Sequence, residues 1–498
     1  MNIGQYILSA QEMQECDNKT MTEHRMPSLV LMERAAMKVV EAITQEFPEA
    51  NKFAVVCGPG NNGGDGVAVA RLLHLKGMTV RCFVMGNPDK FTDQLKQEIA
   101  IAESYGITIE NKFDETAIEQ SSVTIDAMFG IGLSRGLGGD FEKAAVIINE
   151  KANKVVAVDI PSGYDATCGN LLGDAGIRAD LTVTFAYMKK GLTLADCKVA
   201  AGKLIVADVG IYLNEADTNY DTIIDDAIVN HIKPRPVDAN KGSCGKLLII
   251  AGSENIYGAC YLSARSALSS GAGLVKIYTH NNNTESIRQN LPEAMYLGYN
   301  EYNETELQSE LNGADVILIG PGLGMDETSE NILKKTLESA TKPVVIDADG
   351  INLAAKNREL LIQAAKRIPV ILTPHLKEME RLTNIKVSDI NINQEQVAKD
   401  FARETGCILV LKNHTTIVTD GKKTHFITSG NEGLATPGSG DVLAGLMASL
   451  IGQNATESTL ITACAAAYLH GKAGAKASKI YGTKGVLASH IIDNFEKL

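Results

Sequence analysis

The chain of 498 residues exceeds the length at which a single hydrophobic core usually keeps growing, so we expect two domains. Hydrophobic residues make up 45% of it and charged residues 21%, which excludes a largely disordered protein. The formal net charge of −13 excludes nucleic acid or an anionic membrane as the main partner, because both require a basic surface.

The N-terminal segment has no basic stretch followed by an apolar core, and no apolar run approaches the roughly 20 residues of a membrane helix. The nine cysteines are scattered without a Cys-x-x-Cys pair, which is typical of reduced thiols in a core. We therefore expect a cytoplasmic protein. A helix is predicted over 28–47, where an apolar stripe is formed by Leu29, Met32, Ala36, Val39 and Ile43.

The first half continues as short, β-branched segments bounded by Gly, Pro or Asn, which predict buried strands. These segments cover 52–58, 79–86, 122–130, 154–163 and 181–187. Helical patterns lie between them, notably over 66–76 and 140–152. Strands that alternate with helices predict a parallel sheet covered on both faces, so we expect a doubly wound, Rossmann-like three-layer α/β domain.

A glycine-rich turn, GPGNNGGDG over 58–66, follows the first of these strands and opens a helix. It lacks the G-x-G-x-x-G spacing of a dinucleotide turn, which argues against a Rossmann cofactor site. Asn61 and Asn62 supply amide oxygens as well as donors, and Asp65 adds a carboxylate. A purely structural turn rarely needs so many polar side chains, so we expect this turn to bind a polar ligand or a cation.

Two later strands of the first half also end in polar residues, Asp126 in one and Asp159 with Ser162 in the next. In a parallel sheet these strand ends meet at one edge, which is where such folds place their sites. The run GIGLSRGLGG beyond Asp126 supplies backbone amides and Arg135, which suit a pyrophosphate. Taken singly, each aspartate is equally well explained as a helix cap or a loop ligand.

The first half as a whole resembles the NAD(P)HX epimerase family, in YILSAQEMQECDNKT, MPSLVLMERAA, GPGNNGGDG, DAMFGIGLSRG and VDIPSGYDATCG. The resemblance implies that the hydrated dinucleotide NAD(P)HX is bound by Asn61, Asn62, Gly63, Gly64, Asp65, Gly130, Ile131, Gly132, Leu133, Ser134, Arg135 and Asp159. It implies Asp159 as the catalytic, proton-handling residue and a K⁺ site at Asn62, Asp126 and Ser162. A monovalent ion fits neutral oxygens with one carboxylate, whereas zinc requires His or Cys.

The composition changes over residues 214–245, which are acidic at first and then contain Pro234 and Pro236. We place a boundary near 217–226, which gives an N-terminal domain of residues 1–220 and a C-terminal domain of residues 221–498. The alternation of strands and helices restarts in the second domain, with a helical finish from Ser439 onward. Its strands are predicted over 246–253, 273–279, 315–324, 343–350, 369–375 and 407–421.

The segment ATPGSGDVLAG, over 435–445, places glycines directly before an apolar helix. Such a helix N-terminus is an anion site, able to hold a phosphoryl group and its developing charge. Asp441 then lies where a catalytic base is required, although an aspartate here is also explained as a helix cap. Two strand-exit segments, TPHLKEMERL with His375 and Glu378 and KNHTTIV from Lys412, are expected to converge on the same cleft.

Residues 240–492 resemble the ribokinase-like fold and, within it, the ADP/ATP-dependent NAD(P)HX dehydratases. The resemblance rests on NKGSCGKLLIIAGS, YLSARSALSSGAGLVKI, IGPGLG, VIDADGIN, TPHLKEMERL and TPGSGDVLAG, which come in that family's order. It implies Asp441 as the catalytic residue and a NAD(P)HX pocket formed by Ala259, Gly322, Gly324, His375 and Asp441. It also implies nucleotide contacts by Lys412, Asn413, His414, Thr415, Thr416, Gly438, Ser439 and Gly440.

The chain departs from that family at two places, since the family often has Pro-Gly at 376–377 and Gly-Ala at 413–414. Here these positions hold Leu376 and Lys377, and Asn413 and His414. Neither change removes a functional group on which the predicted chemistry depends. The change at 413–414 lies in the predicted nucleotide-binding stretch and leaves undecided whether these two residues contact the nucleotide.

Together the two halves resemble a bifunctional repair enzyme, in which one domain interconverts R- and S-NAD(P)HX and the other dehydrates the S form. The resemblance implies K⁺ in the epimerase domain and Mg²⁺ with ADP or ATP in the dehydratase domain. It favours ADP, with release of AMP and phosphate, and leaves ATP open. We expect small-molecule substrates, no nucleic-acid or membrane partner, and a homo-oligomer. Two alternatives remain: a vitamin or sugar kinase with a regulatory first domain, and a first domain that only binds a ligand or partner.

Overall fold

The computed structural model describes residues 3–213, 220–454, 456 and 458–495. The chain forms two compact units, Tyr6–Tyr220 and Asp221–Leu498, and the segment that ends at Gln5 belongs to the second. Part of the predicted boundary region, residues 217–219, lies outside the described residues. No helix in the described ranges combines the length and the apolar character needed to cross a lipid bilayer.

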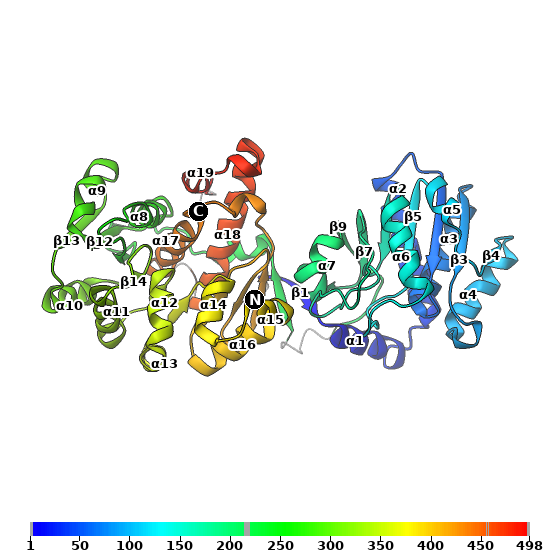
Figure 1. Cartoon of the computed structure of the whole chain (residues 1–498), viewed down its shortest axis with the longest axis horizontal. Helices are drawn as coiled ribbons and strands as arrows, with labels where there is room; N and C mark the ends of the chain where they lie inside the picture. The colour runs from blue at the N-terminus through cyan, green and yellow to red at the C-terminus, as the bar shows by residue number, and fades with distance from the viewer. Residues whose placement is uncertain (1–2, 214–219, 455, 457, 496–498) are drawn as a thin grey trace. The chain divides into compact units, whose positions relative to one another are not determined.

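The N-terminal unit is built on a parallel sheet with the strand order β4-β3-β2-β5-β6-β7-β9 (Figure 1). The five predicted strands are confirmed as β2, β3, β5, β6 and β7, whereas β4 and β9 at the two edges were not predicted. The bounds are β2 (Lys52–Cys57), β3 (Thr79–Val84), β4 (Ile109–Glu110), β5 (Val123–Ala127), β6 (Val155–Val158), β7 (Leu181–Phe185) and β9 (Lys203–Ala207).

Alternating residues of β2 face two helical layers, as a sheet buried on both sides requires. Phe53, Val55 and Cys57 pack toward α2 (Ser28–Glu46), α3 (Asn61–Leu75) and α4 (Asp93–Ser104). Ala54 and Val56 pack toward α5 (Glu115–Gln120) and α6 (Asp140–Lys151). The predicted doubly wound, three-layer fold is therefore confirmed.

Helix α3 begins five residues earlier than the predicted range 66–76, so much of the expected glycine turn is the first turn of the helix. The glycines allow the start of α3 to pack closely against Gly58 and against Ala127 of β5. A Cβ at residue 63 would lie 2.0 Å from the carbonyl oxygen of Gly58, and a Cβ at residue 66 would lie 2.4 Å from Cβ of Ala127. The polar residues Asn61 and Asp65 are consequently held on a rigid element.

The N-terminal arm consists of β1 (Gly4–Leu8) and α1 (Ala10–Thr22), neither of which was predicted. Helix α1 starts with a capping box, in which Ser9 accepts from the backbone N–H of Glu12 and Glu12 accepts from that of Ser9. Strand β1 pairs in parallel with the short strand β8 (Met188–Lys189), with Leu8 opposite Lys189. The remaining elements of this unit are α7 (Ala195–Ala200), η1 (Pro88–Lys90) and η2 (Lys190–Thr193).

The C-terminal unit is built on a sheet with the strand order β13-β12-β11-β14-β15-β16-β17-β18-β19-β10. Neighbouring strands are parallel except for β17-β18 and β18-β19, which are antiparallel. The bounds are β10 (Asp221–Ile224), β11 (Lys246–Ile250), β12 (Leu274–His280), β13 (Met295–Tyr299), β14 (Val316–Ile319), β15 (Val344–Ile346), β16 (Val370–Leu372), β17 (Ile408–Leu411), β18 (Thr416–Thr419) and β19 (Thr424–Ile427).

The strand predicted over 407–421 was wrong as a single element, because β17 and β18 form an antiparallel hairpin there. The polar residues Lys412, Asn413 and His414 lie in the turn between the two strands. A run of three long polar side chains does not fit the interior of a sheet that is buried on both faces. The other five predicted strands of this half are confirmed as β11, β12, β14, β15 and β16.

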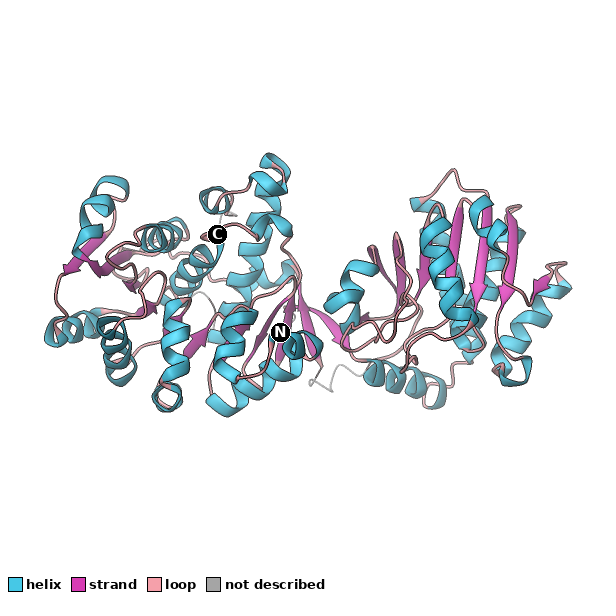
Figure 2. Ribbon diagram, viewed as in Figure 1, coloured by secondary structure: helices cyan, strands magenta, loops and turns pink. Residues whose placement is uncertain are grey.

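Helices α8, α17 and α18 cover one face of this sheet, and Figure 2 shows α10, α11, α12, α14 and α16, labelled in Figure 1, on the opposite face. This arrangement agrees with the ribokinase-like α/β fold expected from the sequence. The helices are α8 (Gly258–Ser269), α9 (Thr284–Asn290), α10 (Glu304–Gly313), α11 (Glu327–Ser339), α12 (Asp349–Lys356), α13 (Arg358–Ala365), α14 (Leu376–Thr383), α15 (Val387–Ile392), α16 (Gln394–Thr405), α17 (Ser439–Gly452), α18 (Thr459–Tyr481) and α19 (Ala488–Asp493), with η3 (Asp226–His231), η4 (Asn281–Asn283), η5 (Glu432–Leu434) and η6 (Thr483–Gly485).

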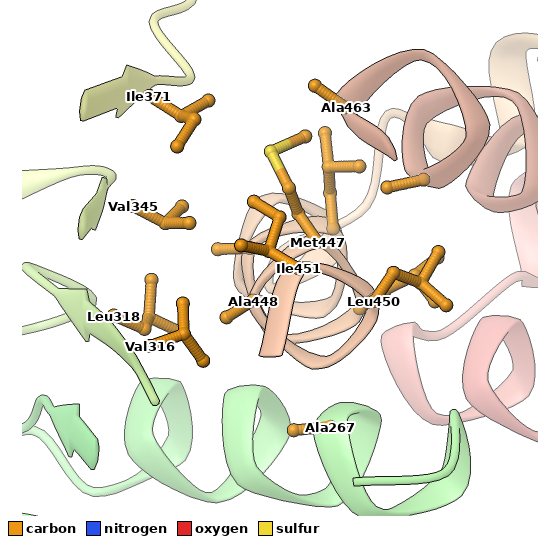
Figure 3. Packing of buried hydrophobic residues seen from close by; sticks show 14 of the residues in the cluster. Ala267, Val316, Leu318, Val345, Ile371, Met447, Ala448, Leu450, Ile451 and Ala463 are labelled. Atoms are coloured by element: carbon orange, nitrogen blue, oxygen red, sulfur yellow. The ribbon is translucent and has the colours of Figure 1, made fainter. Parts of the chain in front are cut away.

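Helix α17 lies at the centre of the core, and all but Gly440 and Asp441 of its 14 residues are buried. Figure 3 shows Met447, Ala448 and Ile451 of α17 between the strand side chains of Val316, Leu318, Val345 and Ile371 and the small side chains Ala267 and Ala463 of α8 and α18. A helix that is apolar all round belongs inside a protein. The core therefore fixes the position of Asp441, in the first turn of this helix.

Candidate active sites

The N-terminal unit contains a cavity of about 610 Å³, a volume typical of small-molecule sites. Its wall combines residues from α1 and α2 with the start of α3 and the loops that follow β5 and β6. Of the residues predicted to bind NAD(P)HX, the cavity is lined by Asn61, Asn62, Asp65, Gly130, Ile131, Gly132, Leu133, Ser134, Arg135 and Asp159. Gly63 and Gly64 do not line it and are buried within the first turn of α3.

The N-terminus of α3 forms part of the cavity wall. Its N-cap residue is Gly60, and no side chain caps the helix. The first N–H groups of a helix have no partners within it and attract an anion. Arg135 lines the same cavity and adds a positive charge. This part of the wall is suited to a phosphate group.

Asp159 lies on the cavity wall in a left-handed backbone conformation, with φ of 69°. Such a conformation is unfavourable for a residue other than glycine and often marks a functional site. Its Oδ1 accepts hydrogen bonds from Nζ of Lys189 at 2.6 Å, Oγ1 of Thr184 at 3.1 Å and the backbone N–H of Phe185 at 3.2 Å. These contacts orient the carboxylate and pair it with a lysine.

Lys189 is a site residue that sequence reasoning missed. Its side chain is only 1% exposed, and its ammonium group also donates to Oγ1 of Thr184 and to the carbonyl oxygen of Phe185. The ammonium group thereby satisfies all three of its hydrogen bonds. The sequence signal was small: two adjacent lysines follow a buried strand, where a surface turn is the usual explanation.

Two further carboxylates line the cavity, Asp17 and Asp65. Burial raises the pKa of Asp17 to about 6, opposed by Lys189 and supported by Asp159. Burial and the charges of Asp159 and Asp17 also raise the pKa of Asp65 well above its usual value. The cavity therefore combines one carboxylate that is paired with a lysine with two whose pKa values burial raises. Asp17 was not predicted, because the quoted segment YILSAQEMQECDNKT gave none of its residues a role in the site.

Asp126 and Ser162 lie behind this wall, fully buried at the ends of β5 and β6. Ser162 donates to Asp126 through its hydroxyl at 2.7 Å and its backbone N–H at 2.8 Å. Burial raises the pKa of Asp126 to about 6 despite these hydrogen bonds. The amide Nδ2 of Asn62 is buried without a hydrogen-bond partner. A monovalent cation takes carboxylate, hydroxyl and amide oxygens, which Asp126, Ser162 and Asn62 possess, whereas the unpaired Nδ2 is a donor and does not itself ligate a cation.

No group of three or more His, Cys, Asp or Glu side chains in the described ranges is arranged to hold a metal ion.

In the C-terminal unit, the glycine turn ends at Gly438, with φ of 85°, and α17 begins at Ser439. A Cβ at residue 438 would lie 2.4 Å from Cδ1 of Leu262, so the turn requires glycine here. No side chain caps α17. The alternative that Asp441 serves as the helix cap is therefore wrong, and the N–H groups of the first turn remain available to an anion.

Asp441 has the properties of a base that works near neutral pH. Burial and the charge of Asp347 raise its pKa to about 7, opposed by Lys412. A carboxylate of this kind accepts a proton more readily than an exposed one does, because its pKa is matched to the working pH.

Lys412, Asp347 and Thr373 form a buried cluster beside this turn. The Nζ of Lys412 donates to Oδ1 of Asp347 at 2.8 Å, and Oγ1 of Thr373 donates to the same oxygen at 2.6 Å. Burial lowers the pKa of Lys412, but the carboxylates of Asp347 and Glu378 outweigh this effect and raise it. Lys412, predicted to contact the nucleotide, is thus an ionised lysine held in place. Asp347, in the quoted segment VIDADGIN, was not assigned a role.

His375 is the N-cap residue of α14, and its Nδ1 accepts from the backbone N–H groups of Lys377 and Glu378. The carboxylate of Glu378 accepts in return from the backbone N–H of His375 at 2.8 Å. Burial raises the pKa of Glu378 to about 7, whereas burial and Lys412 lower that of His375. His375 is therefore neutral, with its proton on Nε2 and its ring half exposed.

The loop after β14 places one predicted pocket residue, Gly322, against another, Ala259 of α8. Gly322 and Gly324 have φ of 60° and 88°, and a Cβ at residue 322 would lie 3.0 Å from Cβ of Ala259. The N–H of Gly324 donates to Asp349 at 3.0 Å. Ala259 and Gly322 thus lie against each other, as the predicted pocket requires.

The residues of the stretch 412–416, predicted to bind the nucleotide, have different surroundings and different exposure to solvent. Asn413 donates to Gln394 at 3.1 Å, His414 is exposed, and Thr416 starts β18. Thr415 is completely buried, so its side chain faces the protein interior. Gly440, by contrast, lies next to the cluster, since a Cβ there would be 3.4 Å from Nζ of Lys412.

Two protein families match separate parts of the chain. Residues 247–497 match the family described as NAD(P)H-hydrate dehydratase, and residues 28–191 match the family described as YjeF-related protein N-terminus.

Whole-chain relatives carry both parts. The chain is 33% identical to the bifunctional NAD(P)H-hydrate repair enzyme Nnr of Moorella thermoacetica, over 98% of this chain and 95% of the relative. It is also 33% identical to the enzyme of the same name from Escherichia coli, over 94% and 89%. A solved structure, the hypothetical protein SMU.573 from Streptococcus mutans, is 33% identical with a TM-score of 0.50 and covers 55% of this chain and 96% of its own.

Proposed function

This chain belongs to the family of bifunctional NAD(P)H-hydrate repair enzymes, and we propose that its two units repair one damaged cofactor in two successive steps. Hydration of NADH or NADPH gives R and S epimers of NADHX or NADPHX. We assign their interconversion to the N-terminal unit and the dehydration of the S epimer to the C-terminal unit. The observation that carries this assignment is Asp441 at the uncapped N-terminus of α17, with a pKa of about 7.

Dehydration needs a nucleotide because hydroxide is a poor leaving group. Asp441 accepts the proton of the ring hydroxyl while the hydroxyl oxygen attacks the terminal phosphoryl group of the nucleotide. The N–H groups at the start of α17 stabilise the charge that develops on this group. The ring nitrogen then expels phosphate, and loss of a proton from the neighbouring carbon restores NAD(P)H. With ADP as donor, the products are NAD(P)H, AMP and phosphate.

Lys412 and Gly440 are the residues best placed for the nucleotide phosphates, because Lys412 is ionised and lies beside the glycine turn. Bound Mg²⁺ neutralises nucleotide phosphates and is usually held by them and by water rather than by a protein cage. We propose Mg²⁺ with ADP, in line with the sequence resemblance, and ATP as the alternative donor.

Epimerisation requires a bond to the carbon that carries the hydroxyl to break and form again, which needs an acid or a base. Asp159 is our candidate for this role, because its carboxylate lies on the cavity wall and is oriented by the hydrogen bond from Lys189. The start of α3 and Arg135 suit the pyrophosphate of the dinucleotide. We propose that Asn62, Asp126 and Ser162 hold K⁺ behind the wall, where the ion compensates the buried charge of Asp126 and supports the loops that form the cavity.

We also place the protein in the cytoplasm, where its proposed substrates arise. The nine cysteines are all free, as expected in a reducing compartment. Assembly as a homo-oligomer stays a prediction, which light scattering of the purified protein measures.

The test is to give the purified protein a mixture of R- and S-NADHX with Mg²⁺ and ADP, then with ATP, and to follow the return of NADH absorbance. We expect complete conversion of both epimers and release of one inorganic phosphate for each NADH. A stable phosphorylated product in place of NADH would instead identify a small-molecule kinase. Conversion that stops at the S fraction would contradict the epimerase assignment and leave the N-terminal unit as a binding module.

A further inference from the structure

Helix α1 contributes one face to the cavity of the N-terminal unit. Met13, Gln14, Asp17 and Met21 line this cavity, and their spacing of three to four residues places them on one side of the helix. Asp17 is the ionisable residue of this face. The capping box at Ser9 and the burial of Met13 and Cys16 hold the helix against the rest of the unit.

Asp17 faces charged groups from each neighbouring part of the cavity: Lys189 on β8, Asp159 after β6, Asp65 on α3 and Arg135 in the loop after β5. Lys189 is already committed to Asp159 by a hydrogen bond of 2.6 Å. Asp17 makes no hydrogen bond that would fix it as a carboxylate within the part of the chain that the structure describes. One cavity therefore contains a carboxylate that is paired with a lysine, Asp159, and a second carboxyl group, Asp17, whose proton is not displaced by such a hydrogen bond.

We infer that Asp17 is a second catalytic residue of the epimerase, the proton donor that works together with the base Asp159. This inference rests on the proposed function of the N-terminal unit. Two carboxylates whose surroundings give them opposite protonation states form the usual acid and base pair of enzymes that cleave a carbon–heteroatom bond.

The substrate chemistry calls for such a pair. The hydroxyl of NAD(P)HX is on a carbon bonded to the ring nitrogen, so the group is a hemiaminal. Asp159 removes the hydroxyl proton, the C–O bond becomes a C=O bond, the C–N bond breaks, and the ring nitrogen takes a proton from Asp17. Rotation of the resulting aldehyde and closure by the reverse steps gives the other epimer. Atoms and charges balance, and neither acid is consumed.

The test follows epimerisation alone, in the full chain without nucleotide, so that dehydration does not occur. R- and S-NADHX are separated by chromatography, and the rate is measured against the spontaneous rate. We expect Asp17→Asn to lower kcat about 100- to 1,000-fold with KM changed less than about threefold, the usual contribution of a general acid. Asp17→Glu should restore part of the rate. Glu15→Gln, an exposed residue of the same helix, is the matched control and should leave the rate unchanged.

The pH profile separates catalysis from a structural role. A proton donor must be neutral, so we expect kcat/KM of the wild type to fall as the pH rises above about 6, the pKa of Asp17. Asp17→Asn should remove this alkaline limb, whereas Asp65→Asn should retain it. The inference is wrong if Asp17→Asn keeps the wild-type rate, or if Asp65→Asn removes the limb instead.

An isotope experiment tests the bond that breaks. S-NADHX prepared with ¹⁸O in its hydroxyl should give R-NADHX that retains the label in ordinary water, because C–N cleavage leaves the oxygen on carbon. Complete loss of the label at the rate of epimerisation would overturn the ring-opening step. If the wild type itself does not accelerate epimerisation, then the proposed function fails, which is distinct from an active wild type that is insensitive to Asp17.

Discussion

The most specific prediction for a single residue concerns Asp441. Asp441→Asn removes the base at the start of α17 but keeps its size, so we expect dehydration of S-NADHX to fall by about 1,000-fold or more. Epimerisation without nucleotide should remain at the wild-type rate. Asp238→Asn, an exposed residue of the same unit, is the control. A variant that still dehydrates would show that another group accepts the proton.

The pH dependence of dehydration follows from the same residue. Asp441 must be ionised to accept a proton, and its pKa is about 7, so kcat/KM should rise about tenfold per pH unit below 7 and level off above it. Lys412 lowers this pKa, and Lys412→Met should therefore move the rise to higher pH. Rate profiles of this variant and of Lys422→Met, an exposed lysine, measure the shift. If the pH–rate profile of Lys412→Met does not move, then Lys412 does not lower the pKa of Asp441.

The candidate cation site is tested through stability. An ion that binds only the folded state stabilises it by about 2.7 kcal/mol at 100 times its dissociation constant. We expect KCl to raise the midpoint of thermal unfolding of the N-terminal unit above that in LiCl of equal concentration. Asp126→Asn should abolish the difference, because it removes the carboxylate of the set. Equal midpoints of the wild type in both salts would exclude a K⁺ site.

Sequence reasoning located residues with a local motif and missed those without one. Ten of the predicted NAD(P)HX contacts line the cavity. They could be predicted because a glycine-rich turn and the end of a buried strand are both recognisable in the sequence. Asp17, Lys189 and Asp347 were not assigned, since their role depends on neighbours distant in the chain. The ion pair of Asp159 with Lys189, for example, is created by the return of the chain through β7 and β8.

At the scale of elements, the contact between α8 and α17 makes a clear stability prediction. A Cβ at residue 445 would lie 2.1 Å from the carbonyl oxygen of Ser263, which is backbone and cannot swing away. We expect Gly445→Ala to lower the free energy of unfolding of the C-terminal unit by about 1–3 kcal/mol, as overpacking does.

Gly313 at the end of α10 is the matched control for this substitution. A Cβ there meets nothing within 4 Å, so Gly313→Ala should be neutral or stabilise by up to about 1 kcal/mol. Urea unfolding measures both variants. Equal stabilities of the two would contradict the close packing of α17 against α8.

Apart from the buried strand β19, the central strands were predicted and the edge strands were not, for a physical reason. A strand buried on both faces is an uninterrupted apolar run, such as VVAV in β6 or VILI in β14. The edge strands β9 and β13 are partly exposed and contain polar or small residues, so their pattern is weaker. The hairpin β17–β18 was missed because two apolar runs close together suggest one strand.

At the scale of the whole molecule, the two proposed activities belong to separate compact units. A mixture of the Asp159→Asn and Asp441→Asn variants should therefore convert R- and S-NADHX completely, since the epimers diffuse from one molecule to another. Asp441→Asn alone should restore almost no NADH, and Asp159→Asn alone should convert the R epimer only at the spontaneous rate. If the mixture restores no more NADH than the two variants restore separately, then both steps must occur on one chain.

The order in which the chain is synthesised gives the position of α17 a further consequence. This helix begins at Ser439, after all strands of the C-terminal sheet, and it covers the apolar side chains of β11, β14 and β15. While the ribosome is still adding the last 60 or so residues, that face of the sheet is open to water and able to associate with other nascent chains. The same late segment carries Asp441, so a prematurely terminated chain has neither a closed core nor the base for dehydration.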